Sequence, residues 1–336
     1  MSIWMRGPGG KLAGLTIGIV LLLACVTANI CFGLQPFTLK QLWLAYSRFN
    51  GSNEHLIITS ARVPRALIAA GVGASLAVAG AVMQTLTRNP LASPSVFGIN
   101  SGSALFIVVA LVVFGSDLTM GTMIWIAFAG AAASALFVYS LGLQRGDGFS
   151  PLKLTLAGTA VAAFSSSVTS GLILINKQSL DEALLWMIGS VSGRQLAHLL
   201  TVAPYMAAGL IVALLLSGAL NVMALGEEIA KGLGQRLTLM RALATLSVIL
   251  LAGSAVSVAG PIAFVGLIVP HLCRYVAGND HRWLLPYCAL IGAMLLVTAD
   301  LASRLIIMPK EVPVGVATAL LGVPFLIHVA RRRQHA

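Results

Sequence analysis

The chain has 336 residues, of which 58% are hydrophobic and only 9% are charged. A soluble domain carries about 25% charged residues, so a soluble fold of this length could not bury so much apolar surface. The net charge of +11 does not indicate nucleic-acid binding, because the 21 basic residues are scattered between long apolar segments and do not cluster on one polar face.

A helix that crosses a bilayer needs about 20 mostly apolar residues. Ten segments of the chain fit this requirement, and the eighth of them is short: 12–33, 64–86, 94–114, 121–143, 152–175, 198–220, 238–259, 261–277, 284–303 and 312–330. We therefore expect an all-α integral membrane protein with ten transmembrane helices, in which residues 1–336 form a single transmembrane domain.

Ten spans place both termini on the same side of the membrane, and the basic residues indicate which side. If the termini are cytoplasmic, thirteen of the 21 basic residues lie on the cytoplasmic side, in agreement with the positive-inside rule. The stretch Gly73–Gly80 also resembles Gly253–Gly260 at an offset of 180 residues. These stretches lie in spans that run in opposite directions, which predicts an inverted repeat of the kind found in transporters.

Two kinds of motif are missing from the sequence. It contains no GxxxxGK[ST] phosphate-binding loop, so the chain is not expected to be an enzyme that hydrolyses ATP. No ionisable residue lies clearly in the middle of a span, and Asp300, near the end of the ninth, comes nearest. Ion-coupled transporters usually keep such residues for coupling. Energy for uphill transport would therefore come from a partner, and an ion-coupled secondary transporter is the alternative.

The loop at 221–236 predicts a short amphipathic helix between the sixth and seventh spans. Leu225, Ile229 and Leu233 recur every four residues and give one apolar stripe. Glu227 and Lys231 form an i,i+4 pair in the favourable order, and glycines at 232 and 234 end the helix. Such a helix either lies on the bilayer surface or docks onto a cytosolic partner.

Three arginines stand out on the side opposite the termini. Arg62 and Arg65 flank Pro64 at the start of the second span, and Arg304 follows the ninth. They either extend to the membrane interface or bind carboxylates of an external protein, for which guanidinium groups are well suited.

Hydroxyl side chains gather in the fifth span, where they either satisfy themselves on their own helix or line an uncharged pathway. The candidates are Thr159, Ser165, Ser166, Thr169 and Ser170, and Asn100, Ser101 and Ser103 open the third span. The six histidines show no ligand spacing, so no metal site is expected.

Several motifs, distributed in order from Arg62 to Phe325, resemble the FecCD-type permeases. These are the membrane subunits of bacterial ABC importers for iron–siderophores, haem and vitamin B12. The motifs include Arg62–Arg65 (RVPR), Gly80–Gln84 (GAVMQ), Asn89–Pro94 (NPLASP), Gly260–His271 (GPIAFVGLIVPH), Asp280–Arg282 (DHR) and Glu311–Gly315 (EVPVG).

The resemblance implies an iron-import permease of the bacterial plasma membrane. Its partners would be a second permease subunit, identical or paralogous, two cytosolic ATPases that bind ATP and Mg²⁺, and an extracytoplasmic binding protein. The chain itself would bind no cofactor. Ferric siderophore is favoured over cobalamin or haem, partly because Asn89–Pro94 and Ala183–Trp186 look more like the siderophore branch.

The resemblance also implies roles for individual residues. Arg62, Arg65 and Arg304 match the arginines that pair with glutamates of the binding protein, and the fifth helix contributes to the pathway. The residues that match the ATPase coupling segment are Leu225, Gly226, Glu227, Glu228, Ile229, Ala230, Leu233 and Gly234.

Overall fold

The structure is a computed structural model that describes residues 7–115, 118–144, 148–175, 180–307 and 309–333. Helices occupy all ten predicted segments. They are α1 (Pro8–Cys31), α4 (Val63–Leu86), α5 (Ile99–Phe114), α6 (Met120–Gly142), α7 (Pro151–Ile175), α9 (Leu196–Leu215), α12 (Leu237–Ala259), α13 (Val265–Ala277), α14 (His281–Leu305) and α15 (Val314–Arg333). Within the described ranges, seven are long and apolar enough to cross a membrane, and α5, α13 and α15 supply shorter apolar segments. The all-α membrane fold is confirmed.

Short elements connect these helices. They are α2 (Leu39–Ser47), α3 (Asn53–Ile57), a π-helical turn η2 (Ile58–Arg62), a 3-10 turn η3 (Pro94–Phe97), α8 (Leu180–Ile188), α10 (Ser217–Ala224) and α11 (Glu227–Gly232). The two-residue strands β1 (Leu143–Gln144) and β2 (Gly148–Phe149) pair antiparallel between α6 and α7.

Three predicted boundaries were wrong because the backbone breaks the helix, and α1 also begins earlier than predicted, at Pro8 and not at 12. The third helix begins at Ile99 and not at 94, because Gly98 adopts a left-handed conformation after η3. The eighth begins at Val265 and not at 261, because Gly260 ends α12 at a φ of +72° and Phe264 is also left-handed. The sixth span, predicted to reach 220, breaks at Leu216 into α9 and α10.

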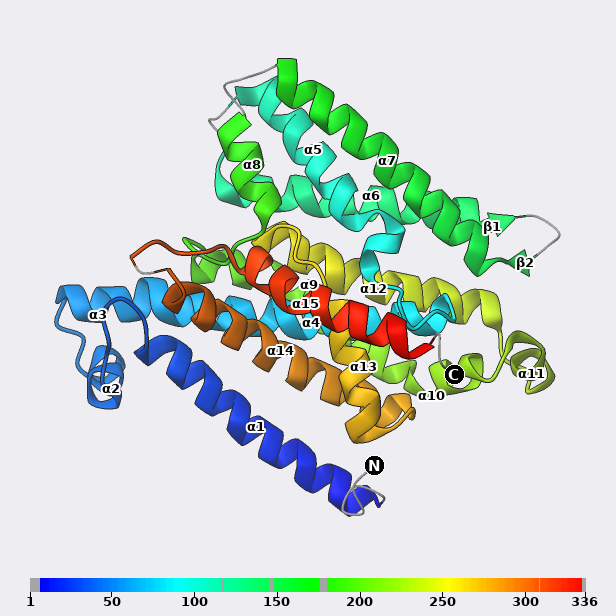
Figure 1. The fold of residues 1–336 in the computed structure, drawn as a ribbon, viewed down its shortest axis with the longest axis horizontal. Coiled ribbons are helices and arrows are strands. Elements are labelled where there is room, and N and C mark those ends of the chain that lie inside the picture. Colours follow the sequence, from blue (N-terminus) through cyan, green and yellow to red (C-terminus); the bar gives the residue numbers. More distant parts are fainter. Residues whose placement is uncertain (1–6, 116–117, 145–147, 176–179, 308, 334–336) are drawn as a thin grey trace.

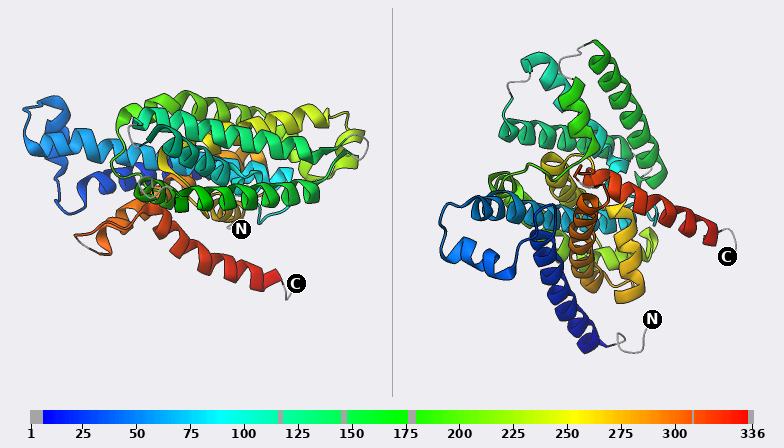
Figure 2. Two further views of the ribbon diagram at one scale, coloured as in Figure 1. Left: turned by 90° about the horizontal axis from the view of Figure 1, so that it is seen from above. Right: turned by 60° about the vertical axis from the view of Figure 1, so that its left-hand side comes forward.

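Helix α4 lies at the centre of the bundle and contacts α14, α12, α13 and α9. Glycines allow the backbones to approach closely. A Cβ atom on Gly73 would overlap the backbone of Gly292 in α14, and one on Gly80 would overlap that of Gly266 in α13. Helices α5 to α8 form a separate layer along one side, and α1 lies on the other (Figure 1). Figure 2 shows the same layers from two further directions.

The bundle has two ends that differ in what they carry. One end carries α11, the start of α1 and the end of α15, and we call it the α11 end (Figure 1). The opposite end carries α2, α3 and the start of α4, and we call it the α2 end. The charged clusters described below lie at these two ends.

Candidate functional site

A buried carboxylate holds three helices together at the α2 end. Asp300 of α14 is 0% exposed. The Arg65 guanidinium of α4 binds it through two nitrogens, with Nε 2.9 Å from Oδ1 and Nη2 2.8 Å from the same oxygen. Arg304 donates from Nη2 to Oδ2 at 3.1 Å, and the Asn29 amide of α1 donates to Oδ2 at 3.0 Å. Two guanidinium groups and one amide therefore satisfy this carboxylate.

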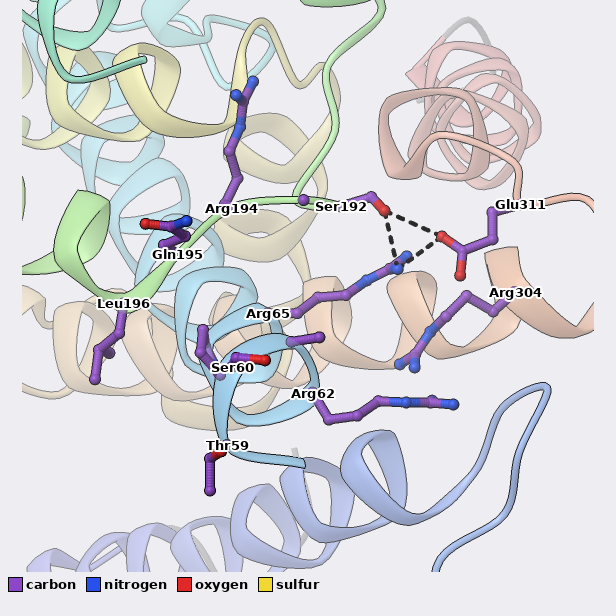
Figure 3. A pocket seen from close by; sticks show the side chains of 13 residues that line it. Thr59, Ser60, Arg62, Arg65, Ser192, Arg194, Gln195, Leu196, Arg304 and Glu311 are labelled. Atoms are coloured by element: carbon purple, nitrogen blue, oxygen red, sulfur yellow. Dashed lines mark hydrogen bonds and ion pairs between the residues drawn. The ribbon is translucent and has the colours of Figure 1, made fainter. Parts of the chain in front are cut away.

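Arg65 also reaches a second carboxylate on the loop before α15. Its Nη1 lies 2.7 Å from Oε2 of Glu311, and the Ser192 hydroxyl donates to the same oxygen at 3.2 Å (Figure 3). Partial burial acts to raise the pKa of Glu311, but the hydrogen bond and charge of Arg65 outweigh it and hold the pKa below its ordinary value. Arg65 therefore joins α4 to α14, to the α14–α15 loop and to the α8–α9 loop.

Arg62 and Arg194 differ from Arg65, because no carboxylate of the described residues lies within ion-pair distance of either. Arg62 donates to the backbone carbonyls of Phe32 (2.7 Å) and Gln35 (3.3 Å). Arg194 contacts the Met120 sulfur, and its Nε has no hydrogen-bond partner. Burial lowers the pKa of Arg194 to about 10.

The predicted docking arginines line one cavity of about 620 Å³ at the α2 end. Arg62, Arg65, Arg194 and Arg304 line it together with the single carboxylate of Glu311, so its wall is strongly basic. The sequence interpretation placed three of these residues at a common surface, and the structure brings them together (Figure 3). Their docking role remains a prediction. Arg304 is buried and Arg65 is held by two carboxylates, so Arg62 is the one of the three without an ion pair among the described residues.

The lowered pKa of Glu311 predicts how stability changes with pH. A carboxylate whose pKa is depressed in the folded state stabilises the fold above its unfolded pKa of 4.5 and loses that contribution as the pH falls through the lower folded value. We expect the difference in melting temperature between wild type and Glu311→Gln to stay constant from pH 7 to about 5 and to shrink below about 4. Thermal unfolding in detergent measures it. A difference that already shrinks between pH 7 and 5 would contradict the Arg65–Glu311 pairing.

A second cluster lies at the α11 end. The predicted amphipathic helix is present, but Gly226, with a φ of +124°, separates it into α10 and α11, so Leu225 precedes the break. The apolar stripe is exposed, at 62% for Leu225, 51% for Ile229 and 65% for Leu233. Ala230, on the opposite side, is fully buried. Helix α11 ends at Gly232, as the sequence predicts.

The charged residues of α11 fix this helix to the bundle. Glu227 pairs with Lys231 at 3.2 Å, as predicted, and also with Arg241 of α12 at 2.9 Å. Desolvation acts to raise the pKa of Glu227, but its hydrogen bonds to Arg241 and Lys231 leave it below the ordinary value. Glu228 is exposed. Glu227 therefore holds α11 against α12 while the apolar stripe faces outward.

The hydroxyl residues of α7 divide between two environments. Ser165 and Thr169 are buried, whereas Thr159, Ser166 and Ser170 are exposed. Thr159 donates to a carbonyl of its own helix. Ser166 and Thr169 line a recess of about 240 Å³ together with Asn100, Ser101 and Met187, which come from α5 and α8. The recess brings together polar residues that the sequence analysis noted separately, and their role in a pathway remains a prediction.

Sequence reasoning missed several residues of these clusters. No pattern of neighbouring residues pointed to them, because their partners are not close in the sequence. They are Asn29, Ser192, Arg194, Arg241 and, as a partner of Arg65, Glu311. Asp300 and Arg304 are four residues apart on one helix, which does predict a pair. Among the residues that the structure describes, no group of three or more His, Cys, Asp or Glu side chains could hold a metal ion.

Comparison with known proteins identifies the family. The model of the FecCD transport family matches residues 21–332. YfiZ of Bacillus subtilis, named as a probable siderophore transport system permease protein, is 49% identical over 94% of each chain. The Fe(3+)-citrate import system permease protein YfmD of the same organism is 42% identical over 97% of each chain. The ferric enterobactin transport system permease protein FepD of Escherichia coli is 41% identical over 94% of each.

A solved structure described as an inward-facing metal-chelate type ABC transporter superposes with a TM-score of 0.83 at 28% identity, covering 96% of this chain and 99% of its own. The exposed stripe at one end, the basic cavity at the other and the apolar helices between them agree with a multi-pass membrane permease. The chain is a transport permease and belongs to the FecCD transport family.

Proposed function

We propose that this chain is the permease subunit of an ATP-driven importer that carries ferric siderophores across the bacterial cytoplasmic membrane by alternating access. The observation that carries the proposal is the family match over residues 21–332, together with three relatives named for iron chelates. The exposed stripe of α11 supports docking of an ATPase, and the basic cavity supports docking of an acidic external protein.

The α11 end would face the cytoplasm, with both termini on that side. The basic residues favour this orientation. Two cytosolic ATPases would bind ATP and Mg²⁺ and contact α11 on this chain and on a second permease subunit. A loaded binding protein would dock at the α2 end, where charge complementarity sets its orientation and association rate.

The test is uptake into proteoliposomes that contain the permease pair, the ATPases and the cognate binding protein. Radio-iron is supplied as ferric citrate, a ferric catecholate and a ferric hydroxamate, with cobalamin and haem as comparators. We expect uptake of at least one iron chelate, and only with ATP inside the vesicles. Uptake of cobalamin or haem alone would overturn the substrate, and uptake driven by an ion gradient without ATP would overturn the whole proposal.

If the exposed apolar stripe of Leu225, Ile229 and Leu233 is the ATPase docking surface, replacing its residues should release the ATPase. Replacing Leu225 and Ile229 together by aspartate places two charges on the surface that would be buried against the partner, so we expect loss of ATPase co-purification and of uptake. Leu39→Asp is the matched control, because Leu39 is equally exposed at the opposite end of the bundle. The docking proposal is wrong if the double variant retains the ATPase as well as the control does.

Arg62 gives the cleanest test of docking at the α2 end. Arg62→Glu reverses a charge that pairs with no carboxylate in the described structure, so we expect binding-protein affinity to fall about tenfold at low salt and less at high salt. Arg48→Glu, at the exposed end of α2 and outside the cavity lining, makes the same change in net charge. Surface plasmon resonance on nanodiscs measures both, and equal affinities for the two variants would rule out Arg62 as a docking residue.

A further inference from the structure

A chain of hydrogen bonds joins the segment before α11 to the central helix of the bundle. Asn221 of α10 contacts both residues at the start of α14. Its Nδ2 donates to Oδ1 of Asp280 at 2.6 Å, and its Oδ1 accepts the backbone N–H of His281 at 2.8 Å. The His281 ring in turn lies between Asn221 and Thr85 of α4, with Nδ1 2.7 Å from Asn221 Oδ1 and Nε2 2.7 Å from Thr85 Oγ1.

The partners determine the direction of each hydrogen bond. Burial acts to raise the pKa of Asp280, but its bonds from Asn221 and the Arg282 N–H hold it below the ordinary value, so its carboxylate accepts. Asn221 must then present its amide nitrogen to Asp280 and its oxygen to His281. His281 Nδ1 therefore carries a proton. In the neutral ring Nε2 accepts the single hydroxyl proton of Thr85 at 2.7 Å, in preference to the Ala81 carbonyl of α4, which lies 3.1 Å from the same hydroxyl oxygen. Each link has one donor and one acceptor, so the chain is complete without water.

The hydrogen bonds between Asn221, His281 and Thr85 are costly to break because they are shielded from water. His281 and Thr85 are both buried, and a buried polar group that loses its partner costs more free energy than an exposed one, which can bind water instead. Thr85 lies one residue from the end of α4, which is packed against α12, α13 and α14. A displacement of α10 would therefore act through His281 on the helix that the rest of the bundle surrounds.

The segment that contains α11 is fastened to α10, so the two would move together. The Gln235 side chain, beyond α11, donates to the backbone carbonyl of Ala219 in α10 at 3.0 Å. The backbone N–H of Gln235 donates to the backbone carbonyl of Ala230 in α11 at 3.0 Å. These hydrogen bonds join residues 217–235 into one segment. The ion pair between Glu227 and Arg241 attaches this segment to α12 as well.

We propose that Asn221, His281 and Thr85 are positioning residues that carry the movement of α11 into the end of α4 and the start of α14. The proposal rests on the docking of an ATPase at α11. It adds a defined route by which that docking moves the transmembrane helices, through a hydrogen-bonded link in addition to the covalent connection to α12.

The experiment measures whether α11 and α4 move as one body. Nitroxide labels are placed at Gly232, which is exposed at the end of α11 with open space around it, and at Arg88, which is exposed just after α4. Their separation is measured by electron spin resonance in the assembled complex, without nucleotide and with ATP and vanadate. We expect the same separation in both states when the link is intact.

When the hydrogen-bonded link is removed, the distance between the two labels should differ between the nucleotide-free state and the state with ATP and vanadate. Thr85→Val keeps the shape of the side chain and removes the hydroxyl, so we expect the separation to shift or broaden when nucleotide is added. Asn221→Leu should do the same, and the double variant should be no worse than either, because both break one chain. Thr85→Ser restores the hydroxyl and should restore the wild-type behaviour.

The matched control is Thr87→Val. Thr87 is buried near the same end of α4, and both hydroxyls lie within hydrogen-bond distance of a carbonyl in their own helix, Thr87 at Met83 and Thr85 at Ala81. Of the two, the Thr85 hydroxyl also contacts His281, so loss of the Thr87 hydroxyl should leave the separation unchanged. The transmission proposal is overturned if Thr85→Val behaves like Thr87→Val, or if α11 and α4 already move apart in the wild type. Retention of the ATPase by the Leu225→Asp, Ile229→Asp variant would instead show that the docking proposal itself is wrong.

Discussion

Replacing Asp300 by alanine is expected to destabilise the protein by about 3–5 kcal/mol, which is the usual cost of removing one partner from a buried ion pair. The carboxylate is fully buried and accepts from Arg65, Arg304 and Asn29. Without it, two guanidinium groups remain close together in a site with little access to water. Asp300→Asn should also be destabilising, because it keeps the volume but removes the charge.

Glu311 provides the matched comparison for Asp300. It binds the same guanidinium of Arg65 but its side chain is 34% exposed, and partly exposed pairs contribute only about 0–1 kcal/mol. Thermal unfolding in one detergent compares Asp300→Ala with Glu311→Ala. If the two variants melt at the same temperature, Asp300 is not the structural centre of the cluster. The joint replacement of Asp300, Arg65 and Arg304 by leucine should recover part of the loss, because no buried charge of the cluster is then left unpaired. Glu311 also loses Arg65, but its side chain is 34% exposed and can be hydrated.

The ion pairs of Arg65 and Arg304 also affect how docking of a binding protein can be tested. Arg65 and Arg304 are predicted docking residues, but in this structure Asp300 and Glu311 already occupy them. A binding-protein carboxylate would have to compete with Glu311 for Arg65, whereas Arg62 donates only to backbone carbonyls. Loss of docking in an Arg65 variant would therefore combine a local structural change with a lost contact, which is why Arg62 is the better probe.

The helices could be predicted from the sequence because their signal is local. An apolar stretch of about 20 residues is a property of composition, and a helix was found at each of the ten predicted segments. The errors fell at Gly98, Leu216 and Gly260, where a break in the backbone decides the helix end. Helix α8 was not expected, and it has only nine residues, too few to give a transmembrane signal.

The clusters were only partly predictable because most of their contacts are not local. The apolar stripe of α11 and the Glu227–Lys231 pair follow from helical spacing, and both are present. The Arg65–Asp300 pair joins residues 235 positions apart, and Thr85–His281 joins residues 196 apart. No periodicity in a single sequence carries that information, so the sequence predicted the arginines of this surface but not the long-range pairing of Arg65 with Asp300 and Glu311.

Gly80→Ala is expected to destabilise the bundle by about 3 kcal/mol, at the upper end of the usual cost of overpacking. An added methyl group would overlap the backbone carbonyl of Gly266, and neither backbone can move without separating α4 from α13. The surrounding side chains cannot relieve the overlap, because the conflict is between one methyl and a main-chain atom. The same argument predicts impaired transport, since α4 is the helix that the proposed link acts upon.

Gly71→Ala is the control on the same helix. A Cβ atom there would make ordinary contacts of 3.6 Å with Leu199 and Met206, beside a recess of about 140 Å³ that Gly71 lines. Alanine also favours the helix by about 1 kcal/mol over glycine, so this variant should be as stable as the wild type or slightly more so. Thermal unfolding of the two variants decides the matter. If Gly80→Ala and Gly71→Ala were equally stable, α4 and α13 would not be in close backbone contact at Gly80 and Gly266. The tight packing of α4 in the centre of the bundle would then be contradicted.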